Sequence, residues 1–230
     1  MAKTVAIVED EPAIRENYAD ALRSQGYNVS TFANRPEAIK SFRNQLPDLA
    51  LLDIGLEDEI DGGFELCREL RSLSETIPII FLTARDSDLD TISGLRLGAD
   101  DYLTKDISIP NLCARITAFF RRIKHAEEPA QENKLLERGE LILDLNRFVV
   151  TWNSKKIDFT LTEFWIVHAL VLHPGHVKNR EQLMQLAKIV VDDATITSHI
   201  KRIRNKIIQR DESFDQIETV YGLGYRWVEK

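Results

Sequence analysis

Four side chains with complementary chemistry each stand directly after a short apolar run of this sequence. They are two carboxylates, a hydroxyl and an ammonium, carried by Asp10, Asp53, Thr83 and Lys105. Clustered carboxylates bind a hard, oxygen-preferring cation such as Mg²⁺, which offsets their mutual repulsion. An ammonium, a hydroxyl and a metal around one carboxylate suit phosphoryl transfer, because positioning and charge neutralisation supply most of that catalysis. We therefore expect Asp53 to act as a nucleophile that forms an acyl phosphate.

Each of these residues also has an ordinary structural explanation. An acid after a strand, such as Asp10, is often a helix cap or a solvated loop residue. Lys105 taken alone is a surface charge, and Thr83 is a strand-end hydroxyl. Glu11 needs no metal, because a carboxylate in a first helical turn interacts favourably with the helix dipole. The ordered set of four residues, rather than any one of them, favours a phosphoryl-transfer site.

The apolar runs alternate with segments of helical periodicity, which indicates repeated strand–helix units. Pro12 and Gly26 fit the start and the stop of the first helix. Five such units predict a doubly wound, five-stranded parallel α/β sheet, whose strand carboxyl ends would gather all four side chains at one edge. The strands are expected at Thr4–Val8, Asn28–Phe32, Leu49–Leu52, Pro78–Leu82 and Asp101–Leu103.

A second group of functional side chains lies in Thr195–Arg210, which carries five basic residues and no acidic one. Isoleucines at 196, 200, 203 and 207 predict a helix with one buried stripe. The opposite face could enter the major groove of DNA, where phosphates supply affinity and base edges supply specificity. The simpler alternative is a solvated basic helix face. The candidate contacts are Thr197, Ser198, Lys201, Arg202, Arg204 and Asn205.

The elements around this helix predict a separate α+β domain. The polar stretch HAEEPAQENK has no apolar periodicity and is typical of a linker. We therefore expect domains at 1–123 and 135–230, joined by a linker at 124–134. Short antiparallel strands within 141–150 and 156–159 precede helices at 162–173 and 179–187, the latter opened by a capping pair, Asn179 with Gln182. A third helix from about residue 193 and the hairpin in TVYGLGYRW complete a winged helix-turn-helix.

Composition limits the setting in which the protein works. The 230 residues suffice for two domains with their own cores. The formal net charge of −7 arises entirely before residue 123, so the second half is neutral apart from its basic helix. Cys67 and Cys113 lie in amphipathic segments and are expected to be reduced core residues. Without an apolar membrane span or a signal peptide, a cytoplasmic protein with no membrane partner is expected.

Residues 1–122 resemble a response-regulator receiver domain at four ordered motifs. These are VEDE at 8–11, LLDIGL around Asp53, FLTA at 81–84 and GADDYLTK at 98–105. The resemblance implies phosphorylation of Asp53 by a sensor histidine kinase, with Mg²⁺ as the cofactor. The implied roles are an acidic metal site at Glu9, Asp10, Asp53 and the Gly55 carbonyl, phosphoryl contacts from Thr83, Ala84 and Lys105, and switch residues Thr83 and Tyr102.

Two departures from the family pattern lie beside this site. The stretch GLEDEIDGG has Glu57 where the family usually has proline, and its loop is about two residues longer. Its additional acids could tune Mg²⁺ affinity or the choice of kinase. Asp106 follows Lys105 where the family has a proline, whose peptide bond is typically cis. A cis bond before a residue other than proline costs ~2.5–4 kcal/mol, so a trans bond is expected here.

Residues 135–230 resemble the winged-helix output domain of the OmpR/PhoB class, at TLTEF, HPGHVKNREQL, VVDDATITSHIKRIRNKI and ETVYGLGYRW. The resemblance implies binding to double-stranded promoter DNA as a head-to-tail pair on direct repeats, with RNA polymerase as a further partner. The connection at 187–192 is short for the loop that often meets the polymerase. Ala194 and Tyr221 replace usual arginines, and Tyr221 becomes the candidate wing contact.

The family also implies a homodimer that phosphorylation promotes, formed through the fourth helix, the fifth strand and the fifth helix. Charged residues remain in this region as candidates for ion pairs between the two copies, although some of the usual partners are missing. The candidates are Asp100, Asp101, Arg115 and Arg122.

The sequence thus predicts a bacterial two-component transcription factor whose only chemistry is self-phosphorylation and autodephosphorylation at Asp53. One alternative is a DNA-binding regulator with a vestigial, phosphorylation-independent receiver, which retention of the four site residues disfavours. Another is a Mg²⁺-dependent phosphohydrolase with an aspartyl-phosphate intermediate, which would leave the winged domain unexplained. Within the family, DIGLEDEIDGG and YLTKD are similar to regulators encoded with proteobacterial sortase systems.

Overall fold

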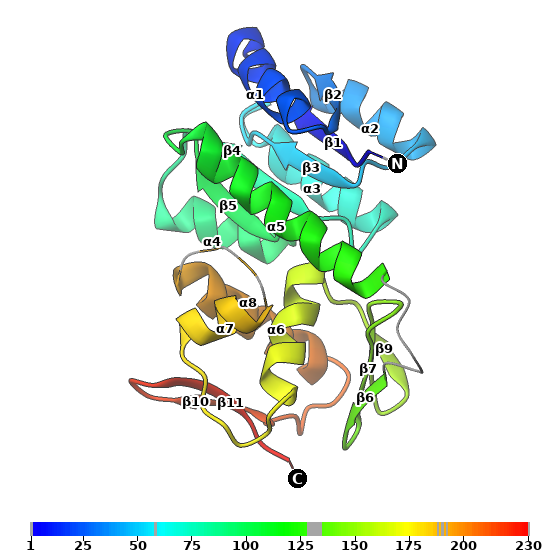
Figure 1. Cartoon of the computed structure of the whole chain (residues 1–230), viewed down its shortest axis with the longest axis vertical. Coiled ribbons are helices and arrows are strands. Elements are labelled where there is room, and N and C mark those ends of the chain that lie inside the picture. The colour runs from blue at the N-terminus through cyan, green and yellow to red at the C-terminus, as the bar shows by residue number, and fades with distance from the viewer. Residues whose placement is uncertain are drawn as a thin grey trace. The chain divides into compact units, whose positions relative to one another are not determined.

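The computed structural model describes residues 2–229 except 58, 128–134, 188, 190 and 192, and it leaves out the side chains of 88 and 122–127. The chain forms two compact units, Met1–Ile116 and Thr117–Lys230, here called the first and second units (Figure 1). No helix in the described part of the chain combines the length and hydrophobicity that crossing a lipid bilayer requires.

The first unit is built on a five-stranded parallel sheet with the strand order β2-β1-β3-β4-β5. The predicted doubly wound sheet is confirmed, and each strand lies within one residue of its expected position. The strands are β1 (Thr4–Val8), β2 (Asn28–Phe32), β3 (Leu49–Leu52), β4 (Ile79–Thr83) and β5 (Asp101–Thr104). The helices are α1 (Pro12–Ser24), α2 (Arg35–Asn44), α3 (Gly62–Leu73), α4 (Asp88–Leu97) and the first part of α5 (Ile109–Glu127), which continues beyond Ile116.

Helices cover both faces of this sheet (Figure 1). Every residue of β3 and β4 is buried, as expected for parallel strands that have apolar neighbours on both sides. Phe81 of β4 packs edge to face against Phe64 of α3, with ring centroids 5.3 Å apart. The pairing of Val8 with Leu52 aligns the carboxyl ends of β1 and β3. The loops that follow these strands therefore leave the sheet at the same edge.

In its described residues, the second unit combines the predicted antiparallel strands, helices and terminal hairpin, and its sheet has four strands, of which the first was not predicted. A reciprocal pair of hydrogen bonds links Asn179 and Gln182 at 2.9 and 2.7 Å, so the expected capping pair is confirmed. The sheet contains β6 (Leu135–Arg138), β7 (Leu141–Asp144), β8 (Val149–Trp152) and β9 (Lys155–Ile157). It is followed by α6 (Leu161–Val171), α7 (Arg180–Ala187), α8 (Asp193–Ile208), β10 (Ile217–Val220) and β11 (Gly224–Trp227).

The start of the predicted linker at 124–134 is helical. Helix α5 continues to Glu127, so the first four residues assigned to the linker are helical. A polar composition removes the apolar stripe of a helix without removing its propensity, and Ala126 and Glu127 both favour helices. The next proline after the first turn of α5 is Pro129, which lies with residues 128–134 outside the described residues.

One carboxylate, that of Glu163, is completely buried beneath α8. It lies 2.9 Å from the Arg202 guanidinium and 2.6 Å from the Lys206 ammonium. It also accepts a 2.8 Å hydrogen bond from the Thr160 backbone amide, within a capping box that starts α6. Burial acts to raise the pKa of Glu163, but the two cations outweigh it and hold the pKa below its ordinary value. This side chain therefore fastens the start of α6 to α8.

The substitution Glu163→Gln is expected to lower the unfolding free energy of the second unit by roughly 3 kcal/mol near neutral pH, because two cations lose their buried counter-charge. The pKa of Glu163 is lower in the folded than in the unfolded chain. Its contribution is therefore complete above a pH of about 4.5 and is lost as the pH falls further. Thermal unfolding followed by tryptophan fluorescence at several pH values measures this, since all three tryptophans lie beyond residue 150.

The exposed Glu212 provides a matched control for this experiment. Glu212→Gln should leave the fluorescence transition unchanged at every pH. The destabilisation by Glu163→Gln should shrink in acid, where the wild-type carboxylate also becomes neutral. Equal losses in the two variants, or a difference that does not depend on pH, would contradict the assigned role of Glu163.

Candidate functional site

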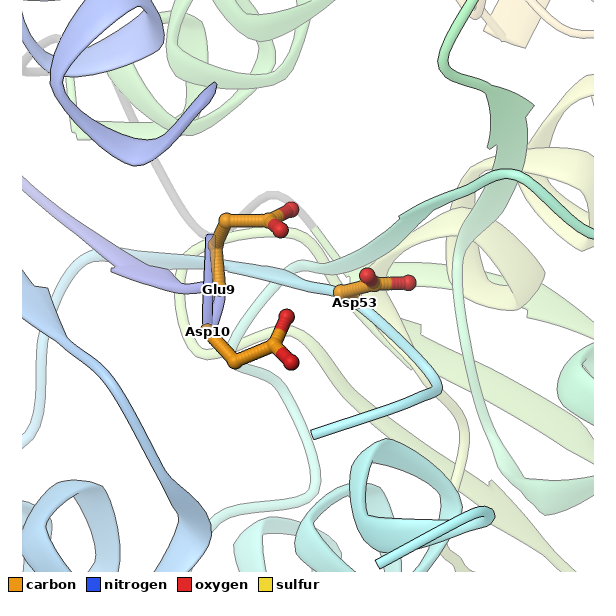
Figure 2. A group of neighbouring side chains, drawn as sticks. All are labelled: Glu9, Asp10 and Asp53. Carbon is orange, nitrogen blue, oxygen red and sulfur yellow. The ribbon is translucent and has the colours of Figure 1, made fainter. Parts of the chain in front are cut away.

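The edge formed by the carboxyl ends of the parallel strands brings together the residues that the sequence singled out. Glu9 and Asp10 follow β1, Asp53 follows β3, and Lys105 follows β5. Figure 2 shows the three carboxylates gathered at neighbouring strand ends. One oxygen from each carboxylate lies within 4.8 Å of the others. Glu9 and Asp53 are buried and Asp10 is half-buried, so this negative charge is concentrated where little water can screen it.

The Lys105 ammonium bridges two of these acids, at 2.7 Å from Glu9 Oε2 and 2.7 Å from Asp53 Oδ2. Burial acts to lower the pKa of Lys105, but its hydrogen bonds to Asp53 and Glu9 outweigh burial and raise it. The pKa of Glu9 is raised to about 7, chiefly by burial, with the charge of Asp53 adding and Lys105 opposing. One ammonium therefore does not balance three carboxylates, and the cluster suits a divalent cation with oxygen ligands.

Backbone contacts fix the position of Asp53. Its Oδ1 accepts a 2.6 Å hydrogen bond from the Ile54 amide, and its own amide donates to the Val8 carbonyl at 2.9 Å. Gly63 at the start of α3 packs directly against this segment, so a Cβ atom there would lie only 1.9 Å from the Asp53 carbonyl oxygen. Close approach of α3 to the strand end thus requires glycine at this position.

The predicted phosphoryl and switch residues lie along the neighbouring loop. Thr83 is the buried last residue of β4, and the exposed Ala84 follows it. Tyr102 is buried beside Phe81, and its hydroxyl donates a 3.0 Å hydrogen bond to the carbonyl oxygen of Arg85. Burial also raises the pKa of Tyr102 well above its ordinary value. The switch residues are thus connected to the loop after β4.

The acidic loop after Asp53 is engaged by arginines that the sequence analysis did not single out. Glu59 lies 2.6 Å from Arg35, and Asp61 lies 3.0 Å from Arg85. Arg85 also donates to the Ile60 carbonyl oxygen. Glu59 and Asp61 therefore have arginine partners within the chain, and a tuning of Mg²⁺ affinity or of kinase choice by the acids of this loop stays a prediction. The sequence contained one signal for this pairing, because Arg85 is positively charged and the insertion after Asp53 is negatively charged.

The Lys105–Asp106 peptide bond is trans, as the sequence predicted. Gly55 lies half-buried in the loop that leaves β3. The Asp106 carboxylate accepts a hydrogen bond from the Thr104 hydroxyl. This local contact holds the Asp106 carboxylate at the end of β5.

The second unit presents a polar face of α8 beside an exposed hairpin tip. Thr197, Lys201 and Asn205 are exposed, and Ser198 is half-buried. Tyr221 in the turn between β10 and β11 is 93% exposed, so nothing in its own chain prevents a contact with a partner. In the described part of the chain, no ion pair or hydrogen bond engages the Lys201 ammonium.

Two of the predicted DNA contacts have structural partners instead. The Arg202 side chain is buried against Glu163, which corrects its assignment to the DNA-facing surface. The Arg204 guanidinium is half-buried and donates to the Ile217 carbonyl oxygen at 3.1 and 2.8 Å. Helical spacing placed both arginines near the polar face, but their long side chains reach partners on other elements.

The predicted dimer residues also make contacts within the chain. Asp100 is fully buried, and its carboxylate accepts from Arg71 at 2.7 Å and from the Ile79 amide at 3.1 Å. This corrects its assignment to an ion pair between copies. Asp101 is buried and pairs with Arg115 at 2.8 Å. The side chain of Arg122 lies outside the described residues.

The substitution Gly63→Ala is expected to destabilise the first unit by about 3 kcal/mol, because the new methyl group collides with backbone rather than with a movable side chain. Gly55→Ala is the matched control, since a Cβ there meets its nearest atom, the Ile60 carbonyl oxygen, at 4.0 Å. Hydrogen exchange of the amides in β1 and β3 measures the difference. Similar exchange in the two variants would show that α3 can move away from Asp53 at little cost.

Comparison with known proteins identifies both units. The family model for the response regulator receiver domain matches residues 5–117. The model for the C-terminal domain of transcriptional regulatory proteins matches residues 154–227. The structure itself is similar to that of the response regulator DrrB, a Thermotoga maritima OmpR/PhoB homolog. The two structures give a TM-score of 0.52 at 28% identity over 99% of this chain and 100% of DrrB.

Full-length relatives give the same result. The transcriptional regulatory protein BaeR of Escherichia coli is 38% identical over 97% of this chain and 92% of its own length. The phosphate regulon regulator PhoB of Rhizobium meliloti is 37% identical over 98% of both chains. With both family models in the expected order and relatives aligned over nearly the whole length, the chain belongs to the OmpR/PhoB class of two-component response regulators and acts as a transcription factor.

Proposed function

We propose that Asp53 is the phosphoacceptor and that Mg²⁺ bound in the acidic cluster assists its phosphorylation by a sensor histidine kinase. The observation that carries the proposal is the arrangement of Glu9, Asp10 and Asp53 within 4.8 Å, with Lys105 on Asp53. Phosphoryl transfer needs a carboxylate nucleophile among groups that neutralise incoming negative charge. This edge of the sheet is where Asp53, Lys105 and the partly uncompensated acids meet.

In the proposed reaction a carboxylate oxygen of Asp53 bonds to the phosphorus atom of the kinase phosphohistidine as the phosphorus–nitrogen bond breaks. Lys105 already contacts Asp53 Oδ2 and pairs with a phosphoryl oxygen afterwards. The Thr83 hydroxyl and the Ala84 amide supply donors from the neighbouring strand end. Asp10, Asp53 and the Gly55 carbonyl, with Glu9 beside them, would hold Mg²⁺, which would supply charge neutralisation when bound.

Incubation with acetyl phosphate and Mg²⁺ is expected to add one phosphoryl group to the intact protein at Asp53. Asp53→Ala should acquire none, and Asp10→Asn should react roughly 10²-fold more slowly, because it removes an acidic metal ligand. The exposed Asp20→Asn is the control and should react like wild type. Intact-mass measurement with peptide mapping follows the product. A rate that chelation of Mg²⁺ leaves unchanged, or a product at another residue, would contradict the assignment.

We further infer that α8 reads promoter DNA through its exposed polar residues while the hairpin β10–β11 approaches the adjacent minor groove. The exposure of Lys201 and Asn205, and the 93% exposure of Tyr221, support this arrangement. Arg202 is excluded from it by burial. Thr197 and Ser198 complete the candidate contact set near the start of α8.

The substitution Tyr221→Arg is expected to strengthen DNA binding and to steepen its salt dependence by about one counterion, because guanidinium is attracted to the negative potential of a narrow minor groove. Lys201→Ala should have the opposite effect and reduce the slope by about one. Tyr221→Phe is the uncharged control and should keep the wild-type slope. Binding isotherms over a salt series on A·T-flanked and G·C-flanked duplexes decide the matter. If Tyr221→Arg changes neither affinity nor slope, the hairpin tip does not approach the minor groove.

The remaining partners follow from the proposed function. A phosphorylation-promoted homodimer on direct repeats would place two second units on one promoter, where RNA polymerase is the expected further partner. Because Asp101 and Arg115 pair within the chain, dimer formation through them would require these contacts to be exchanged. A protein that contacts both a kinase and a promoter, as proposed, would work in the bacterial cytoplasm. Residues 188, 190 and 192 of the connection at 187–192 lie outside the described residues.

A further inference from the structure

Arg204 connects the recognition helix α8 to the hairpin β10–β11. Its Nε and Nη2 atoms donate to the same acceptor, the Ile217 carbonyl oxygen, at 3.1 and 2.8 Å. Nη2 also donates to the Thr219 hydroxyl at 2.9 Å. Two contacts to β10 from a planar guanidinium fix direction as well as distance. The side chain therefore holds the first strand of the hairpin at a defined position on α8.

The second strand of the hairpin is fixed by an aromatic ring that contacts the same arginine. The Tyr225 ring is buried, with Arg204 Cζ at 5.9 Å from its centroid and Arg180 Cζ of α7 at 6.0 Å. The Tyr225 hydroxyl donates to the Thr197 hydroxyl at 3.4 Å. Its backbone exchanges two hydrogen bonds with Lys178, at 2.8 and 2.9 Å. The hairpin thus contacts both helices and the turn that precedes α7.

The Arg204 guanidinium is not placed to bind a DNA phosphate. Burial lowers its pKa, and no carboxylate in the described part of the chain lies within ion-pair distance. Three of its possible donor bonds are already made, and all of them go to β10. Lys201, one helical turn earlier, is exposed and shows the opposite situation. The two basic residues on one helix therefore have different tasks.

We propose that Arg204 is a positioning residue, which orients the hairpin and its tip at Tyr221 relative to α8 and acts on DNA through that hairpin rather than through a phosphate contact of its own. This proposal rests on the DNA binding proposed above for the second unit and specifies how its geometry is set. Arginine is needed because lysine offers a point charge that cannot donate in parallel to Ile217 and Thr219.

The salt dependence of DNA binding separates the two tasks. The probe is a duplex selected from a random-sequence library by the wild-type full-length protein. Arg204→Ala should weaken binding about tenfold while keeping the wild-type salt slope, whereas Lys201→Ala should lower the slope by about one. Arg204→Lys retains the charge and should bind as weakly as Arg204→Ala. A slope reduced by about one in Arg204→Ala, or full rescue by lysine, would overturn the proposal.

A double substitution tests positioning against a general loss of stability. If Arg204 orients the hairpin tip, the affinity gained by Tyr221→Arg should largely disappear in the Arg204→Ala background and persist in the Lys201→Ala background. A gain of the same size in both backgrounds would show that Arg204 does not position the tip. Residues that are linked through a shared backbone element are expected to be coupled in this way, whereas independent sites contribute additively.

Hydrogen exchange in the free protein makes the proposal testable apart from DNA binding. Arg204→Ala should speed exchange at the amides of Lys178 and Tyr225, which bond to each other's carbonyl oxygens, and Lys201→Ala should not. If the wild type selects no duplex, the proposed DNA function fails while exchange still decides whether Arg204 holds the hairpin. Unchanged exchange at these amides in Arg204→Ala would overturn the positioning role.

Discussion

The site depends on one constraint, the parallel pairing that makes β1, β3 and β5 end at the same edge of the sheet. This pairing forces the carboxylates that follow β1 and β3 into a partly buried cluster, where like charges repel strongly. Lys105 from the end of β5 relieves part of that repulsion and fixes Asp53, while burial, with the charge of Asp53 adding to it, keeps the pKa of Glu9 raised to about 7. The same imbalance prepares the edge for added positive charge. A bound cation or phosphoryl group, as proposed for this edge, would change that local balance of charge.

In the second unit, the charge that must be compensated is positive. Its helix α8 carries an excess of positive charge, and the buried Glu163 takes up Arg202 and Lys206 within the fold. Arg204 is directed to the hairpin by backbone and hydroxyl acceptors. The number of basic residues in a helix therefore overstates the charge it offers to DNA. In this helix the charge that remains exposed is concentrated at few positions, which is why the proposed DNA recognition relies on the relative placement of the helix and the hairpin.

The sequence was sufficient to predict elements whose pattern is local and sites that topology alone assembles. The apolar runs located all five parallel strands, and parallel order then brought Asp10, Asp53 and Lys105 to one edge. The errors involve contacts that no local pattern contains. Arg202 pairs with Glu163 from a helix far away in the sequence, Asp100 is held by Arg71 from α3, and α5 extends because a polar segment can still be helical. Helical periodicity predicts the face of the helix on which a residue lies. The position of the charged group at the end of a long side chain depends instead on its interaction partner.

The loop after Asp53 shows how a local departure from a family pattern can be accommodated. Additional loop length costs little conformational entropy, but additional acids beside a negatively charged site would be unfavourable unless they are paired. Arg35, which lies in α2, pairs with Glu59, and Arg85, which lies in the loop after β4, pairs with Asp61. The carbonyl oxygen of Arg85 also accepts a hydrogen bond from the Tyr102 hydroxyl. The same residue therefore contacts the loop after Asp53 and the aromatic ring on β5, so displacement of either loop must break or exchange a contact made by Arg85.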